Sequence, residues 1–285
     1  MPDFPRTSLG GLSVSRMVIG TNWFRGFSHT THAKDELILQ LCDRKHISDI
    51  LTVFFRNGID TLIARYESNP MLDAVRDAEQ RTGRKALLIS TPAFPIGPET
   101  PEKGLDLANT AEILDRQASF GVSIVLPHQC TTDALLDRCT RRIRQIEPVL
   151  RMIRDRGMIP GFSTHMPETI MYSDESGLDV ETYISIFNAM GFLMQVEVDW
   201  TARVIRNAKK PVLTIKPLAA GHLRPFQALT FVWNAIREQD MVAVGTLTPR
   251  EAEEVIELSR SILERRAADI GLQETRSKRS IKPKA

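Results

Sequence analysis

The stretch RTSLGGLSVSRMVIGTN, residues 6–22, decides the fold. Gly10 and Gly11 predict a tight turn between two short strands, because glycine readily adopts the left-handed backbone that two-residue hairpin turns require. The apolar run at 17–21 then predicts a buried strand that ends at a Gly-Thr pair. We therefore expect the chain to open with a hairpin and to continue directly into a buried strand.

Beyond this opening, apolar runs of strand length alternate with amphipathic runs of helix length. We expect strands near 17–21, 59–64, 86–91, 122–127, 158–163, 182–187, 212–217 and 241–245. We expect helices over 46–57, 69–82, 107–119, 140–155, 167–174, 194–207, 225–238 and 248–270. Eight strands that are each followed by a helix predict an α/β fold, a single (β/α)8 TIM barrel, rather than an open sheet.

The domain organisation follows from the same pattern. Residues 1–270 are expected to form one barrel domain, because no Ser/Gly-rich linker interrupts the alternation. Residues 271–285 are basic and poor in apolar side chains, so we expect a disordered tail there.

One segment is ambiguous between strand and helix. Residues 195–200 alternate between polar and apolar side chains as a strand does, but the apolar residues between 194 and 205 also fall on one helical face. We expect a helix, in which Glu197 and Asp199 are exposed residues of the first turn and not ligands inside the barrel.

Composition limits the class of protein. The 285 residues carry a net charge of only +2, with 37 basic and 35 acidic side chains interspersed, so neither a nucleic acid nor an acidic partner is expected. Three unclustered cysteines, Cys42, Cys130 and Cys139, favour a reducing, cytoplasmic location. No apolar run reaches the roughly 18 residues that span a membrane. A small molecule is the expected partner, and the oligomeric state is left open.

Several short motifs occur in an order that resembles the aldo-keto reductases. Besides the opening, these are Gly58-Ile59-Asp60-Thr61, Leu126-Pro127-His128-Gln129, Gly161-Phe162-Ser163-Thr164-His165, Lys216-Pro217-Leu218-Ala219-Ala220-Gly221 and Val244-Gly245-Thr246-Leu247-Thr248-Pro249. Together with Gly26-Phe27-Ser28-His29, they are similar to a divergent branch of these barrels. The resemblance implies a barrel with an N-terminal hairpin, within a superfamily of NAD(P)-linked oxidoreductases.

The resemblance also implies a catalytic tetrad of Asp, Tyr, Lys and His, most of which this chain lacks. Only His128 matches cleanly. The Asp position falls on Ile63, the Tyr position on Ser68 and the Lys position on Pro92. In the family, the Lys and the Asp lower the pKa of the Tyr so that it can protonate a carbonyl. This chain is therefore predicted to have left the family's standard chemistry.

An alternative alignment takes Asp60 as the tetrad acid, which puts Arg65 at the Tyr position and Tyr66 one place away. A carbonyl reductase with a rearranged tetrad of Tyr66 and His128 is the corresponding alternative.

The nucleotide-binding segment of the family differs here as well. The last helix opens with the acidic residues Glu251, Glu253 and Glu254, so we expect NADPH to bind weakly or not at all. Backbone amides near Gly221, Gly245 and Thr246 are nevertheless predicted to hold a phosphate or a carboxylate.

In such barrels, chemistry occurs where the carboxyl ends of the strands meet the following loops. The residues at these positions form a polar, cation-rich rim. We predict His128, His165 and Tyr66 as catalytic residues, and Asn22, His29, Arg65, Asn188 and Lys216 as substrate-binding residues.

For three of these residues the sequence leaves the chemistry open. His128 and His165 close adjacent strands, so they are expected to form an acid/base pair or to hold a divalent metal. Lys216 is expected to hold a phosphate or carboxylate, and a Schiff base with a carbonyl substrate is the alternative.

These observations predict an atypical enzyme with an aldo-keto-reductase-like barrel. It would act by acid/base chemistry on a small polar carbonyl substrate, anionic or carbohydrate-like, as an isomerase, epimerase or lyase. A non-catalytic ligand-binding barrel is the second alternative, because this fold hosts many functions.

Overall fold

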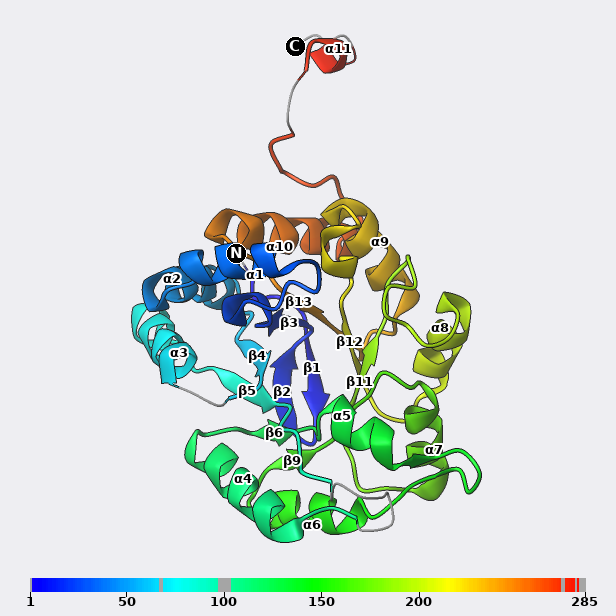
Figure 1. Ribbon diagram of the computed structural model, residues 1–285. Coiled ribbons are helices and arrows are strands. Elements are labelled where there is room, and N and C mark those ends of the chain that lie inside the picture. Colours follow the sequence, from blue (N-terminus) through cyan, green and yellow to red (C-terminus); the bar gives the residue numbers. More distant parts are fainter. Residues whose placement is uncertain (1, 67–68, 97–103, 273–274, 280, 282–285) are drawn as a thin grey trace.

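The structure, a computed structural model, describes residues 2–66, 69–96, 104–272, 275–279 and 281. It is a parallel β-barrel ringed by helices, with a two-stranded hairpin across one end (Figure 1). The hairpin pairs β1 (Arg6–Leu9) with β2 (Leu12–Ser15) in antiparallel register. Gly10 and Gly11 form its turn with φ values of +53° and +88°, as the sequence predicts.

Nine strand segments build the barrel and occupy eight strand positions. They are β3 (Met17–Gly20), β4 (Thr61–Ala64), β5 (Leu87–Ser90), β6 (Ile124–Val125), β9 (Ile159–Pro160), β10 (Phe162–Ser163), β11 (Tyr183–Ile186), β12 (Val212–Ile215) and β13 (Met241–Val244). All neighbouring pairs are parallel, and β13 pairs with β3. The expected eight-stranded α/β barrel is confirmed.

The fifth barrel strand is interrupted at Gly161. The segment before it, β9, pairs with β6, and the segment after it, β10, pairs with β11. This one strand therefore closes the barrel. A side chain at Gly161 would place its Cβ 2.5 Å from the carbonyl oxygen of Thr182 and 2.9 Å from Leu126, so only glycine fits without a backbone shift.

Helices surround the strands (Figure 1). They are α1 (His32–Leu41), α2 (Arg44–Arg56), α3 (Asn69–Thr82), α4 (Leu107–Ser119), α5 (Gln129–Thr132), α6 (Glu147–Asp155), α7 (Glu168–Ser176), α8 (Val198–Asn207), α9 (Pro225–Ala235), α10 (Pro249–Leu263) and α11 (Arg276–Arg279). Short 3₁₀ turns occur at η1 (Trp23–Arg25), η2 (Asp133–Leu135) and η3 (Ala219–Gly221). Glu197 and Asp199 are exposed at the start of α8, and no strand forms at 195–200.

Two differences from the predicted helices are informative, and the last helix, α10, also ends at Leu263 instead of residue 270. A small hairpin of β7 (Leu136–Asp137) and β8 (Arg142–Ile143) replaces the predicted start of the helix at residue 140. The Asp137 carboxylate accepts the backbone N–H groups of the next turn, which competes with a helix. Helix α1 was not predicted, because it buries only Ile38 and so lacks a clear apolar face.

The core has two layers. The barrel interior is filled by side chains such as Val18, Ile124 and Leu213, and it also contains Leu9 and Val14 of the hairpin. The hairpin therefore closes the amino-terminal end of the barrel. The second, larger layer lies between the strands and the helices. Residues on one strand alternate between the two layers, so neighbours along a strand face opposite sides.

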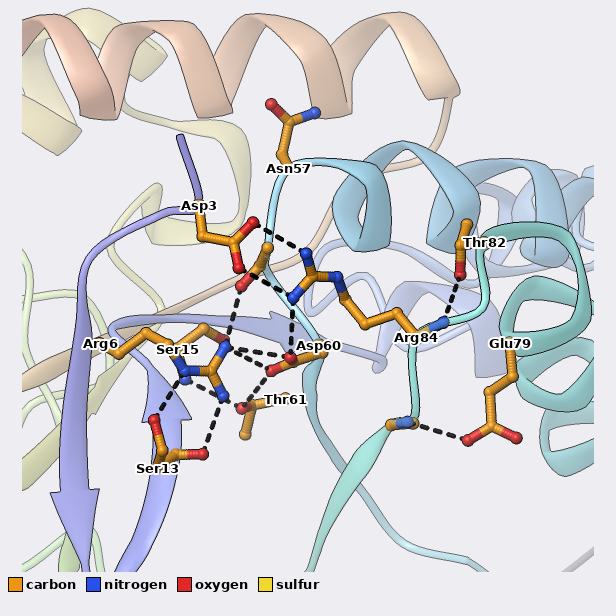
Figure 2. A network of polar contacts seen from close by, with 12 residues as sticks. Asp3, Arg6, Ser13, Ser15, Asn57, Asp60, Thr61, Glu79, Thr82 and Arg84 are labelled. Carbon is orange, nitrogen blue, oxygen red and sulfur yellow. Dashed lines mark hydrogen bonds and ion pairs between the residues drawn. The ribbon is translucent and has the colours of Figure 1, made fainter. Parts of the chain in front are cut away.

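A polar network holds the hairpin to the barrel wall (Figure 2). The Arg6 guanidinium donates to both carboxylate oxygens of Asp60 at 3.0 Å and to the carbonyl of Gly58 at 3.1 Å. It also donates to the side chain and the carbonyl of Ser13 on the opposite hairpin strand, at 2.8 Å each. Asp60 is thus committed to the amino-terminal end of β4, remote from the carboxyl ends of the strands.

The carboxyl-terminal segment leads away from the barrel to α11 (Figure 1). Residues 273–274, 280 and 282–285 of the predicted tail lie outside the described residues. None of the described helices combines the length and apolar character needed to cross a bilayer.

Gly161→Ala should destabilise the barrel by about 1–3 kcal/mol, because the added methyl group overpacks against the backbone of Thr182. Gly271→Ala is the matched control. Its Cβ would meet nothing within 4 Å, and we expect a change within about 0.5 kcal/mol. Urea unfolding curves measure both. Equal midpoints for the two variants and the wild type would show that Gly161 does not constrain closure.

Candidate active site

Four basic side chains gather at the carboxyl-terminal mouth of the barrel. His128 follows β6, His165 follows β10, Lys216 follows β12, and His29 lies in the loop after β3. The charges of Lys216, His128 and His29 all lower the pKa of His165. Such effects fade over about 10 Å in physiological salt, so the four groups share one region. We refer to these four residues as the mouth cluster.

His165 is a neutral imidazole near pH 7. Burial is the largest cause and the nearby Lys216 the second, and together with the two other histidines they lower its pKa to about 4. A neutral imidazole can accept a proton, which a charged one cannot. The role of the two-histidine pair stays a prediction, and His165 is the member that this environment keeps neutral.

The backbone of His165 is held by an aspartate that sequence analysis missed. Asp133 in η2 accepts the His165 backbone N–H at 3.1 Å with Oδ2 and the Thr164 hydroxyl with Oδ1. Burial raises the pKa of Asp133 and these hydrogen bonds oppose the increase. Asp133 therefore links the loop after β6 to the loop after β10. No pattern in the sequence around Asp133 predicts its contact with Thr164, because the two residues are 31 positions apart in the chain.

Lys216 is the only lysine in the mouth cluster, and its backbone is unusual. Its φ of +61° lies in the left-handed region, where a residue with a side chain costs about 1–3 kcal/mol. Burial lowers the pKa of its ammonium to about 8. Among the described residues, neither a hydrogen bond nor an ion pair reaches this ammonium. A half-buried cation without a counter-ion is typical of a functional group.

His128 has a defined tautomer. Its Nδ1 accepts the backbone N–H of Cys130 at 3.3 Å, at the start of α5, and the Cys130 Sγ lies 3.0 Å from the same nitrogen. When the ring is neutral, the proton must therefore reside on Nε2. This assignment makes His128 Nε2 a hydrogen-bond donor.

The loop after β3 contributes His29 and Asn22. The amide Nδ2 of Asn22 donates to Nε2 of His29 at 3.3 Å. His29 has a φ of +60°, and the adjoining Ser28 donates its N–H and hydroxyl to Asp35 of α1. Desolvation and the charge of Lys216 lower the pKa of His29. The previously unpredicted helix α1 thus positions one member of the mouth cluster.

Tyr66 is not with the mouth cluster. Its side chain packs in the layer between the strands and the helices, and its hydroxyl donates to the carbonyl of Leu62 at 3.4 Å. Burial raises the pKa of this phenol. The structure places Tyr66 apart from the other predicted catalytic residues. Alternate residues of a strand face opposite sides, and Tyr66 continues the outward-facing series of Leu62 and Ala64.

Arg65 borders a second hollow near the rim. This pocket of about 240 Å³ lies beside α4, and its lining includes Arg65, Tyr66, Pro92, Arg116 and Gln117. None of the mouth-cluster residues lines it. Arg65 therefore lies at a pocket that the mouth cluster does not line.

Asn188 also needs correction as a substrate-binding residue. It is fully buried at the end of β11, where its Oδ1 accepts the N–H groups of Met190 and Phe192 and its Nδ2 donates to the Phe192 carbonyl. The amide therefore shapes its own loop.

The backbone groups that were predicted to hold an anion are largely engaged in hydrogen bonds or packing within the protein. The Gly221 N–H donates to the Leu218 carbonyl at 2.9 Å. Gly245 permits a close approach to Gly20, whose Cβ would lie 3.3 Å from the Gly245 nitrogen. The hydroxyl of Thr246 remains available to a ligand, because it is buried and has no hydrogen-bond partner among the described residues.

The start of α10 carries its own carboxylate. Thr248 accepts the Glu251 N–H at 3.1 Å, and the Glu251 carboxylate accepts the Leu247 N–H at 2.7 Å. This capping box uses amides that would otherwise face an anion, and it places a negative charge there.

The structure gives no support, among its described residues, to the alternative that the two histidines hold a metal ion. The described residues contain no group of three or more His, Cys, Asp or Glu side chains that could hold a metal ion. His128 and His165 by themselves would supply two of the ligands that a metal needs.

Comparisons with known proteins show which solved structures share this fold. No protein-family model and no curated protein matches the sequence. A structure of a putative aldo-keto reductase from Pseudomonas aeruginosa matches with a TM-score of 0.66 and 15% identity, covering 92% of this chain and 97% of that chain. The glycerol dehydrogenase of Gluconobacter oxydans matches with a TM-score of 0.56 and 13% identity, covering 95% and 98%.

An aldo/keto reductase from Klebsiella pneumoniae, solved in complex with NADP and acetate, matches with a TM-score of 0.56 and 16% identity, covering 95% of this chain and 92% of that chain. The chain has the barrel fold of the aldo-keto reductases. The identity is low throughout, so the likeness extends to the fold alone. Within this aldo-keto reductase fold, Asp60 is paired with Arg6 at the far end of the barrel. The alternative alignment of the tetrad through Asp60 is therefore wrong.

Lys216→Met should stabilise the fold by about 1–3 kcal/mol at pH 7, because it removes a buried ammonium that lacks a counter-ion. The unfolded chain binds the Lys216 proton up to pH ~10.4, and the folded chain only up to about pH 8. The gain in stability of Lys216→Met over the wild type should be largest below pH 8 and should shrink as the pH rises toward 10. Thermal melts at several pH values measure it.

Lys45→Met is the control for this prediction, because Lys45 is exposed and paired with Asp49 across one helical turn. We expect it to change stability by less than about 0.5 kcal/mol at every pH. A Lys216→Met variant that is less stable than the wild type at pH 7 would mean that the ammonium has a partner in solution.

Proposed function

We propose that this protein is an enzyme that moves protons on a small, negatively charged carbonyl compound. The observation that carries the proposal is the mouth cluster, which unites a neutral imidazole at His165 with the cation of Lys216. Abstraction of a proton beside a carbonyl needs a base and a group that stabilises the enolate oxygen, and this cluster offers both. Isomerisation, epimerisation and elimination share that step.

Each residue has a role in the proposal. His165 is the base, since its low pKa keeps it unprotonated near neutral pH. The Nε2–H of His128 donates a hydrogen bond to the substrate oxygen, and Lys216 provides positive charge for the anionic group. Asn22 and His29 orient a hydroxyl group from the loop after β3. Arg65 stands at a separate hollow beside α4 and would contact only a substrate that extends there.

A nicotinamide-dependent carbonyl reductase is the second candidate. It is favoured by the shared fold, since the Klebsiella pneumoniae protein was solved with NADP, and by the unsatisfied hydroxyl of Thr246. Three observations weigh against it: Pro92 stands where the family has its Lys, Tyr66 is buried toward the helices, and Glu251 caps α10. The proton-transfer function therefore accounts for more of the site.

Histidine substitutions test the proposed chemistry without knowledge of the natural substrate. The protein should catalyse exchange of carbon-bound protons for deuterium in D2O with at least one of pyruvate, hydroxypyruvate and dihydroxyacetone phosphate, followed by proton NMR. His165→Asn and His128→Asn should each slow this exchange by roughly 10²-fold or more, the scale of a lost acid or base.

Tyr66→Phe is the matched control, and it should exchange at the wild-type rate because its hydroxyl lies outside the mouth cluster. The proposal fails if the wild type exchanges no faster than buffer for all three compounds, or if both histidine variants exchange at the wild-type rate. In that case a non-catalytic ligand-binding barrel becomes the better description.

NADPH should bind weakly or not at all, because the Glu251 carboxylate occupies the amides at the start of α10 and repels phosphate. Titration of the protein with NADPH, followed by nicotinamide fluorescence, gives the dissociation constant. Glu251→Gln should tighten binding relative to the wild type, since it removes the charge and keeps the cap. A sub-micromolar wild-type constant would favour the reductase instead.

A further inference from the structure

Lys216 differs from the lysines at the other end of its own strand. Lys209 and Lys210 precede β12, and both are satisfied: Lys209 Nζ donates to the Asp174 carbonyl at 2.7 Å, and Lys210 Nζ lies 3.0 Å from Glu181. Lys216 follows β12 with no such partner among the described residues. The strand thus ends in an amine whose charged form receives no compensation from the protein.

The backbone of Lys216 departs from the regular conformation of its strand. Leu213 and Ile215 belong to the barrel-interior layer, so regular alternation would send the next side chain outward, toward the helices. The positive φ of Lys216 breaks the alternation, and its charge instead acts on His165 and His29. Non-glycine residues persist in this conformation where the surrounding structure requires them, commonly at functional sites.

Among the described residues, the groups on which the charge of Lys216 acts are bases. His165 faces it from the loop after β10, His29 from the loop after β3, and His128 lies with them after β6. In the part of the chain that the structure describes, two carboxylates near these groups are engaged in hydrogen bonds: Asp133 accepts from the Thr164 hydroxyl and the His165 N–H, and Asp35 of α1 accepts from Ser28. The surroundings therefore favour a neutral amine.

We infer that Lys216 is a nucleophile that forms an imine with the carbonyl carbon of the substrate. The inference rests on the proposed function and deepens it, because it defines the substrate class: an aldehyde or ketone with an acidic C–H next to the carbonyl and a carboxylate or phosphate. A neutral amine attacks such a carbon, whereas an ammonium has no lone pair to do so.

The atoms of this step balance within the site. The Nζ lone pair forms a C–N bond, the carbonyl oxygen takes up a proton, and the amine loses one, which gives a carbinolamine. The C–O bond then breaks, the His128 Nε2–H donates a hydrogen bond to the departing hydroxide, and the hydroxide takes up a proton from solvent and leaves as water. The product is a protonated imine. No oxidant, reductant or other co-reactant is consumed.

The imine explains why the base and the amine lie together. A protonated imine withdraws electrons more strongly than a carbonyl does, so the adjacent C–H becomes more acidic. His165 removes that proton, and the electron pair is delocalised onto the nitrogen of Lys216. The positive charge of the protonated imine also remains where the proposed function places a cation for the anionic substrate.

Chemical trapping tests the inference on the wild-type protein. Glyoxylate, which carries both an aldehyde and a carboxylate, is added with sodium cyanoborohydride at pH 7, and the labelled lysines are mapped by peptide mass spectrometry. Lys45 and Lys85 are internal references, because both are exposed surface lysines. At pH 7 an amine with a pKa of about 8 has ~100-fold more neutral form than an ordinary lysine, so Lys216 should label at least ~10-fold faster.

The pH dependence supplies a second readout. Labelling of Lys216 should rise up to about pH 8 and then level off, while labelling of the two references should keep rising toward pH ~10. Lys216→Arg preserves the positive charge and lacks the amine, so it should lose the adduct and the catalysed proton exchange. Its thermal melt shows whether it is folded.

The outcomes separate this inference from the proposed function. Labelling of Lys216 no faster than of Lys45 and Lys85, or proton exchange by folded Lys216→Arg at the wild-type rate, would overturn the imine. If exchange still depends on His165 in that case, the acid/base proposal stands with Lys216 as a simple cation. If Lys216 is labelled preferentially while His165→Asn and His128→Asn exchange normally, the imine stands and the histidine roles are wrong.

Discussion

Closure of the barrel at Gly161 is the constraint on which the site depends. The fifth strand changes partner at this residue, from β6 before it to β11 after it. Because parallel strands end at the same rim, this arrangement places the residues after β6 and β10 side by side. His128 and His165 are neighbours for that reason, although 36 residues of chain separate them. A side chain at Gly161 would push away the Thr182 backbone, just before β11, and would disturb the pairing on which closure depends.

The mouth is electrostatically incomplete without a ligand. Three imidazoles and one ammonium gather there, and the nearby carboxylates of Asp35 and Asp133 are held by loop hydrogen bonds. An anionic substrate would supply the missing negative charge. It would also raise the pKa of His165 above its ligand-free value of about 4, because a nearby anion favours the protonated ring. The base would therefore become stronger when the substrate is bound.

Much of the fold was predictable from the sequence, and the site only in part. Glycines at the turn and apolar runs of strand length report directly on backbone geometry, so the hairpin and the eight barrel positions could be located. Strand endings also identified His128, His165 and Lys216. Tyr66 could have been placed correctly by strand alternation, since it shares the parity of Leu62. Asp133 and Asn188 act through contacts within or between loops, which no periodic pattern encodes.

The capping box of α10 has a consequence for how the barrel treats nucleotides. Glu251 is tethered within one helical turn of the amides that it accepts, so it acts as an intramolecular competitor with an effective concentration in the millimolar range or above. A nucleotide phosphate would have to displace this side chain instead of filling an empty helix terminus. We therefore expect this one acidic residue to weaken the binding of nucleotide phosphates at this helix terminus.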